Sequence, residues 1–218
     1  MSTHSSPLRT AFALAGALAL SACGGILPKA EPMQILQPQV HVTADPAWPQ
    51  ANWQLAIVRP RSNDMIETPR LVVNPTPDRV EVYKGVAWSD STPELVQQAM
   101  ISAFEDSNRI TAVSRQGNGL RTDFLLQSDL RDYQAVYRTP AGPPDIVLTI
   151  SVKLVDFASS RVVASRVFTQ TQAATSTDVH AVAQAFDTAL GNVLHELVGW
   201  TLAQGNQARA EAERSRKR

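Results

Sequence analysis

The stretch Asp145–Phe157, which reads DIVLTISVKLVDF, indicates the fold class more clearly than any other part of the sequence. Isoleucine, leucine or valine occupies every second position from Ile146 to Leu154, and most of the positions between them are polar. A period of two predicts a β-strand with one buried face, which is typical of antiparallel sheets. The segment 123–133 alternates in the same way, and 161–171 follows after a short turn, so we predict a meander of three long strands.

Two helices are expected beside this meander. Ser91-Thr92-Pro93-Glu94 has the spacing of a capping box, in which the serine hydroxyl accepts from the third helical amide and the glutamate reaches back to the serine amide. This helix should end near Asn108. A second, longer helix should begin after a cap at Asp178 or Ser176 and bury one apolar stripe, which includes Phe186, Leu190 and Leu194.

Shorter strands are expected at 53–58, 70–73, 79–83 and 110–114, where apolar and β-branched residues lie between turn-forming residues. Together with the meander and the two helices, they predict an α+β fold. We expect a two-layer domain in which a mainly antiparallel sheet is covered on one face by two amphipathic helices.

The N-terminal segment resembles that of a bacterial lipoprotein precursor. Residues 10–20 form an uncharged, Ala- and Leu-rich run that is too short to span a bilayer but typical of a signal peptide. The sequence LSACG that follows resembles a lipobox, which implies cleavage after residue 22 and attachment of lipid to the thiol of Cys23. Gly24, where Asp is associated with inner-membrane retention, favours the periplasmic face of the outer membrane. A buried structural cysteine and an ordinary signal peptide are the alternatives.

The rest of the chain divides into three parts. Residues 23–52 contain five prolines and no sustained period, which predicts an extended tether carrying the lipid, although an edge strand around 34–43 is the alternative. The folded domain is expected at 53–203. The polar residues 204–218 are expected to form a frayed helical extension or a disordered tail.

Composition and motifs argue against nucleic-acid binding and against catalysis. Lys plus Arg and Asp plus Glu both number 20, so no excess of positive charge is available for a phosphate backbone. His195-Glu196 lacks the second histidine of a zinc-binding HExxH motif, and His180 stands alone. The acidic pairs Asp129/Asp132 and Glu105/Asp106 are typical of solvated surfaces. We therefore expect no enzyme activity, no metal site and no cofactor.

Several phrases in order resemble one protein family: WxL with Arg59-Pro60, Tyr83 with WSD at 88–90, LRxD at 120–123, LxDY at 130–133, and a C-terminal helix ending near Trp200. With the lipobox, they make the chain similar to the ABC-type transport auxiliary lipoproteins, the family of the Pqi-system lipoprotein. The resemblance covers roughly residues 53–200.

This resemblance implies a non-catalytic lipoprotein that docks an Mce-type lipid transport system at the outer membrane. Its partners would be an Mce-domain protein and ABC transporter components, and a homo-oligomer is left open. Trp88, Ser89 and Asp90 are either a strand anchor and helix cap, which we favour, or a partner contact. A lipoprotein that assembles or plugs an outer-membrane complex, as in lipopolysaccharide export, is the alternative function, and a periplasmic hydrolase is the third.

Overall fold

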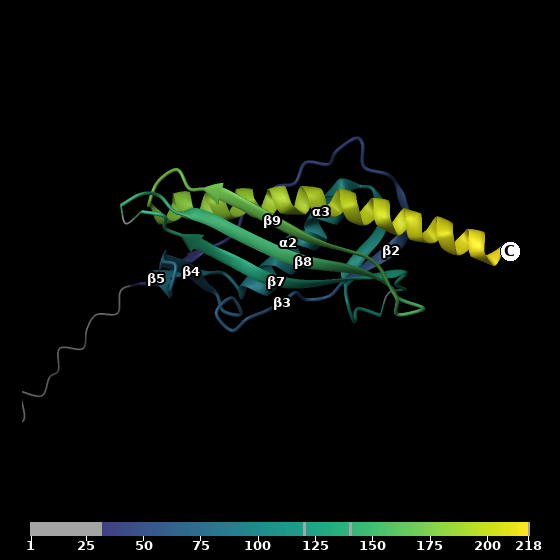
Figure 1. Cartoon of the computed structure of the whole chain (residues 1–218), viewed down its shortest axis with the longest axis horizontal. Helices are drawn as coiled ribbons and strands as arrows, with labels where there is room; N and C mark the ends of the chain where they lie inside the picture. Colours follow the sequence, from purple (N-terminus) through teal and green to yellow (C-terminus); the bar gives the residue numbers. More distant parts are fainter. Residues whose placement is uncertain (1–31, 120, 140, 218) are drawn as a thin grey trace, which may run out of the picture. The chain divides into compact units, whose positions relative to one another are not determined.

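Nine strands and two helices occupy the residues that the structure, a computed structural model, describes, namely 32–119, 121–139 and 141–217 (Figure 1). The region Met33–Arg218 forms one compact unit. Cys23 and the expected signal peptide lie outside the described residues. In chain order the elements are β1 (Gln34–Leu36), β2 (Ala51–Ile57), β3 (Arg61–Ser62), β4 (Arg70–Thr76), β5 (Arg79–Trp88), α2 (Thr92–Ser107), β6 (Ile110–Arg115), β7 (Phe124–Val136), β8 (Asp145–Asp156), β9 (Val162–Ala173) and α3 (Val179–Arg216).

The three long strands β7, β8 and β9 form the expected antiparallel meander. β8 pairs with β7 from Phe124 opposite Asp156 to Val136 opposite Asp145, and on its other side it pairs with β9. The alternation in β8 is reflected in burial, because all five apolar residues of its inner face, from Ile146 to Leu154, are at most 1% exposed. The α+β prediction is therefore confirmed.

The shorter strands add parallel pairings to this sheet. β2 runs parallel to β6 on one side and to β7 on the other, β3 and β4 also run parallel to β7, and β1 runs parallel to β5. Parallel neighbours need a long crossover connection. Part of the connection between β2 and β6 is the helix α2, so the period change at Ser91 marks the crossover.

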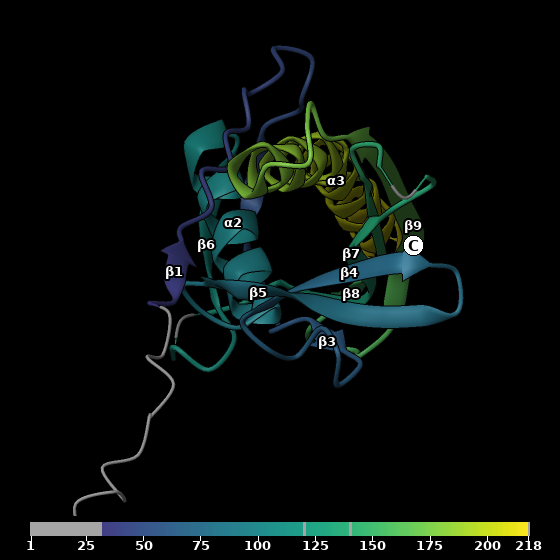
Figure 2. The same cartoon turned by 90° about the vertical axis from the view of Figure 1, so that its left-hand side faces the viewer.

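Both helices contribute to a single core with the sheet (Figure 2). The stripe predicted for the second helix is confirmed, since Phe186, Leu190 and Leu194 of α3 are at most 2% exposed. Phe186 lies at the centre of an aromatic cluster, with its ring centroid 5.5 Å from that of Trp88 and 4.8 Å from that of Tyr133. None of the described helices combines the length and apolarity needed to cross a membrane.

Part of the segment expected as a tether, 23–52, lies inside the compact unit, which begins at Met33. Residues 37–50, which we call the strap, pass over α3 (Figure 1). The backbone amide of Gln39 donates to Asp187 Oδ2 at 3.0 Å. Trp48 is only 8% exposed, and its ring packs where Gly199 of α3 leaves room, since a Cβ there would lie 2.5 Å from the ring. The alternative of an edge strand around 34–43 holds for residues 34–36, because β1 pairs with β5 at the end of the sheet. Leu36 and Trp48 also bury apolar surface that holds the proline-rich chain in place.

The first part of the expected tail also belongs to the fold. Helix α3 continues to Arg216, so the helical alternative holds for residues 204–216. Trp53 Nε1 donates to Asn206 Oδ1 at 2.8 Å, and Arg209 pairs with Asp123 at 2.9 Å. Gly205 leaves room for the Trp53 ring, since a Cβ at this position would lie 2.3 Å from it.

Candidate functional site

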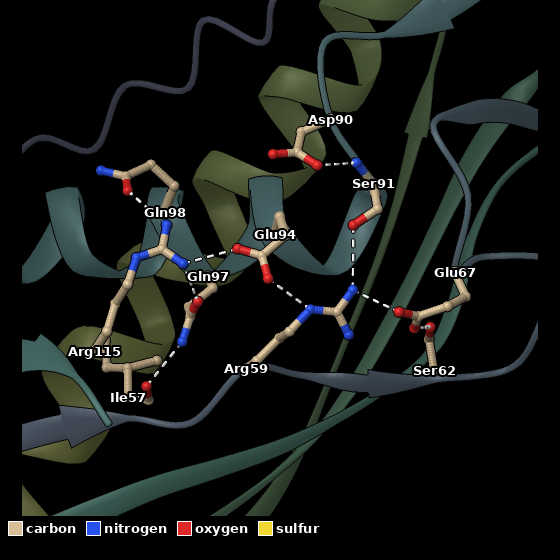
Figure 3. A network of polar contacts seen from close by, with 10 residues as sticks. All are labelled: Ile57, Arg59, Ser62, Glu67, Asp90, Ser91, Glu94, Gln97, Gln98 and Arg115. Atoms are coloured by element: carbon tan, nitrogen blue, oxygen red, sulfur yellow. Dashed lines mark hydrogen bonds and ion pairs between the residues drawn. The ribbon is translucent and has the colours of Figure 1, made fainter. Parts of the chain in front are cut away.

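A polar network lies at the start of α2, next to Asp90, for which a partner contact is one expectation (Figure 3). Arg59, just after β2, donates through Nε to Glu94 Oε1 at 2.7 Å. Its Nη2 donates to Glu67 Oε1 at 2.5 Å and to Ser91 Oγ at 3.2 Å. One guanidinium group therefore ties the N-terminus of α2 to the end of β2 and to the loop before β4.

Arg115 of β6 extends the network on the other side of Glu94. Its Nη1 donates to Glu94 Oε2 at 2.7 Å and to Gln97 Oε1 at 2.5 Å, and Gln97 Nε2 donates to the Ile57 carbonyl at 2.9 Å. Gln97 is buried, so this last bond satisfies an amide that would otherwise be costly inside the core. Helix α2 is thereby joined to two strands.

The charges in this network are paired, which limits what chemistry they can perform. Hydrogen bonding to Arg115, and then to Arg59, holds the pKa of Glu94 below its ordinary value. Arg59 does the same for the pKa of Glu67. Carboxylates held in the charged form by guanidinium groups are poor proton donors near neutral pH. The arrangement therefore connects elements and does not form an acid–base pair.

The capping-box prediction is right in position and wrong in its bonds. Ser91 is the N-cap residue of α2, and Pro93 lies in the first turn as expected. The Ser91 hydroxyl makes no cap bond, however, and the Ser91 amide donates to Asp90 Oδ1 at 2.6 Å rather than to Glu94. The reason is electrostatic, because two guanidinium groups attract the Glu94 carboxylate more strongly than one backbone amide.

Trp88, Ser89 and Asp90 divide between the core and the surface. Trp88 is 2% exposed and packs edge to face on Phe186, so it anchors the end of β5. Ser89 and Asp90 are exposed, and the Ser89 amide donates to the Leu36 carbonyl at 2.9 Å. A partner contact in this segment remains a prediction, and it now concerns the two exposed residues.

A second candidate site is a hollow of about 370 Å³ between the strap and α3, which is lined in part by Asp187. Asp187 Oδ2 accepts from the backbone amide of Gln39, while its buried Oδ1 has no hydrogen-bond partner among the described residues. Burial raises the pKa of Asp187 above its ordinary value, and the Gln39 bond lowers it in part. Sequence analysis missed this residue, since the only signal was a carboxyl beside the apolar stripe of α3.

Two histidines of α3, His180 and His195, hold the N-terminal region against this helix. His195 Nδ1 lies 3.2 Å from the Thr43 carbonyl oxygen, and its ring is 4.9 Å from that of Trp48. His180 bonds to Gln34 at 2.9 Å. Within the described ranges no three His, Cys, Asp or Glu side chains gather closely enough to hold a metal ion.

The acidic pairs considered for catalysis lie on solvated surfaces. Asp129 and Asp132 of β7 are separated by a β-bulge and face Ser151 and Thr149 of β8 in the sheet register. Glu105 and Asp106 are exposed in the last turn of α2. These placements agree with the surface interpretation of all four carboxylates.

Several known proteins are similar to this chain in sequence or in structure. The uncharacterised protein bll6063 of Bradyrhizobium diazoefficiens is 30% identical over 148 residues, which are 68% of this chain and 39% of that relative. This chain thus spans well under half of the relative's length. The crystal structure of XCC0632 from Xanthomonas campestris is 40% identical, with a TM-score of 0.77 over 81% of this chain and 99% of that one. Another solved structure, of an uncharacterised protein, has a TM-score of 0.61 at 9% identity over 77% of this chain and 97% of that one, which shows the fold alone.

The family model for the ABC-type transport auxiliary lipoprotein component matches residues 34–198. The match starts at β1 and includes the strap, in agreement with the boundary of the compact unit. It therefore extends nearly 20 residues further toward the N-terminus than the phrases on which the resemblance was first based. The chain belongs to the family of ABC-type transport auxiliary lipoprotein components.

Proposed function

We propose that this protein is the lipid-anchored, non-catalytic component of an Mce-type ABC transport system and docks the lipid transport machinery at the periplasmic face of the outer membrane. Family membership supports a role beside a transporter. The lipobox-like sequence around Cys23 supports the anchor. The paired charges around Arg59 support a role in binding rather than in proton transfer.

The observation that carries this proposal is the short distance along the chain between the anchor and the fold. The compact unit begins at Met33, ten residues after Cys23. Ten residues span at most about 36 Å even when fully extended. A domain held so close to the membrane has a high effective concentration for a partner that reaches the same surface. Docking is then favourable even when the individual contact is weak.

Lipidation is tested by labelling cells with a clickable fatty acid. Cys23→Ser should lose the label, because only a thiol accepts the diacylglyceryl group. Ser21→Ala is the matched control, since it keeps a small residue at the cleavage site and should retain the label. Label on the Cys23→Ser variant would contradict the anchor, and with it the proposed role.

Density-gradient fractionation of membranes tests whether the protein resides in the outer or the inner membrane. The unchanged protein should be recovered with outer-membrane markers. Gly24→Asp should move it toward the inner membrane if the residue after the modified cysteine directs sorting. Recovery of the unchanged protein with inner-membrane markers would limit the proposal to an anchored transport component of the inner membrane.

The partner is tested with a photo-crosslinking amino acid at Asp90, which is exposed at the start of α2. A cross-link to an Mce-domain protein is expected there, and little should form from the control position Asp106 at the other end of the helix. A cross-link from Asp90 to a lipopolysaccharide-export protein instead would favour the alternative role in outer-membrane assembly.

A further inference from the structure

A second polar hollow lies on the opposite side of the sheet from the helices. It has a volume of about 250 Å³ and is lined by residues of β3, β7 and β8. These three strands are paired in the sheet, and their labels mark them in Figure 1. The buried face of β7 includes Leu126 and Leu130, so the alternating residues of this strand face outward into the hollow. The charged residues that line the hollow are Arg59, Arg61, Arg131, Lys153 and Asp129.

The sheet register brings these charges together. Arg61 of β3 stands opposite Asp129 of β7, and Lys153 of β8 stands opposite Gln127 of β7. Residues directly opposite each other share one face of a sheet. Arg131 occupies the bulge between Leu130 and Asp132, where the extra residue of β7 has no partner on β8. Bulges often redirect a side chain, and this one adds Arg131 to the other cations of the hollow, Arg59, Arg61 and Lys153.

The hollow carries more positive charge than the surrounding residues neutralise. Arg59 is paired with Glu67 and Glu94. Arg61, Arg131 and Lys153 make no ion pair or side-chain hydrogen bond with any of the residues that the structure describes. Asp129 is the one carboxylate in the lining. Three cations without an ion-pair partner among the described residues therefore line one hollow of a chain whose formal net charge is zero.

We propose that this hollow binds the phosphate group of an anionic phospholipid. Arginine forks match phosphate oxygens with paired hydrogen bonds, and lysine adds a point charge. Gln127 and Ser151 supply further donors in the same lining. The volume lies just below the range typical of sites for drug-sized molecules and suits a compact charged headgroup.

An apolar side chain next to the hollow indicates a lipid rather than free phosphate. Val167 of β9 stands opposite Ser151, which lines the hollow, and is 48% exposed. Among the described strands β9 pairs only with β8, so no described strand covers its other edge. A cationic hollow bordered by an exposed valine suits an amphiphile with a charged head and an apolar body. This inference goes beyond docking, which requires no lipid contact by this chain.

The test uses the mature lipoprotein, purified from membranes in nonionic detergent, with lipid adducts counted by native mass spectrometry. Phosphatidylglycerol should be retained in preference to phosphatidylcholine, whose headgroup is zwitterionic. The double variant Arg131→Gln/Lys153→Gln should lose about tenfold or more of the phosphatidylglycerol affinity, because two charge-assisted contacts are removed. The control Arg79→Gln/Lys84→Gln, on β5, also removes two exposed cations and should bind like the unchanged protein.

A variant with the opposite charge change keeps the proposal testable if the double variant folds poorly. Asp129→Asn removes the carboxylate of the hollow and should tighten phosphatidylglycerol binding. Equal binding by the unchanged protein, the double variant and Asp129→Asn would overturn the inference. Displacement of the lipid by inorganic phosphate at equal concentration would also overturn it, because the site would then recognise free phosphate. Neither result depends on the Mce partner, so these measurements test lipid binding independently of the proposed docking function.

Discussion

The two helices begin with different polar chemistry at the N-cap residue. Asp178 accepts from the backbone amides of His180 and Ala181, whereas the Ser91 hydroxyl oxygen accepts from Arg59 Nη2. Asp178→Ala should therefore cost about 1 kcal/mol of the free energy of unfolding, as loss of a cap usually does. Ser91→Ala should cost less, because Arg59 keeps both of its carboxylate partners. Urea denaturation of the two variants measures the difference, and equal losses would mean that the Ser91 hydroxyl contributes as much as a cap.

Asp187 should make stability depend on pH. Burial raises its pKa in the folded state above the value in the unfolded chain, so the folded protein binds this proton more tightly. The associated stabilisation is fully present below the ordinary carboxyl pKa, near 4, and is lost as the pH rises through the raised folded value. Asp187→Asn should therefore raise the denaturation midpoint at pH 7 and change it little at pH 3.

The control for this pH effect is Asp106→Asn, which changes an exposed carboxyl at the end of α2. It should leave the midpoint nearly unchanged at both pH values. If Asp187→Asn lowers the midpoint at pH 7, the charged carboxylate stabilises the strap through Gln39 by more than its burial costs.

At the scale of single elements, α3 holds the sheet through its apolar stripe. Leu190 is 2% exposed inside the core, so Leu190→Ala should cost about 2 to 5 kcal/mol through lost contacts and the cavity left behind. Gln184→Ala, at an exposed position of the same helix, should change stability by less than about 0.5 kcal/mol. An unchanged denaturation midpoint for Leu190→Ala would contradict the packing of α3.

The last turns of α3 should differ in their importance for stability. Removal of residues 210–218 keeps the contacts of Asn206 and Arg209 and should leave the melting temperature nearly unchanged. Removal of 205–218 deletes both contacts and uncovers Trp53, which is 2% exposed in the complete fold. This longer truncation should lower the melting temperature and shift tryptophan fluorescence toward the solvent-exposed value. Similar behaviour of the two truncations would place the stabilising contacts elsewhere.

For the whole molecule, loss of the anchor should affect function far more than folding. Cys23 lies outside the compact unit, so a chain secreted without lipid keeps every contact of the core. Tethering can raise avidity by roughly 10² to 10⁴ without any new contact. Unlipidated protein in the periplasm should therefore keep its melting temperature yet fail to restore membrane integrity in a deletion strain. Full complementation at native expression levels would favour a diffusible carrier.

Local patterns in the sequence were sufficient for the elements whose side chains repeat regularly. The alternation in β8 and the stripe through Phe186, Leu190 and Leu194 each specify a buried face, because strand and helix periods follow from backbone geometry alone. Asp178 could be identified as a cap because its partners are the amides of the same helix. The family could also be named, since its phrases recur in order along the chain.

Contacts between distant segments could be decided only by the tertiary structure. Glu94 has the spacing of a capping-box residue, but arginines 35 positions before it and 21 positions after it determine its bonds. The strap resembles a tether because prolines interrupt any period, yet α3 holds it through Asp187 and Gly199. The cationic hollow joins β3, β7 and β8, which only the register of the sheet brings together. A sequence determines local periods and caps, whereas side chains that meet from distant segments depend on how the whole chain packs.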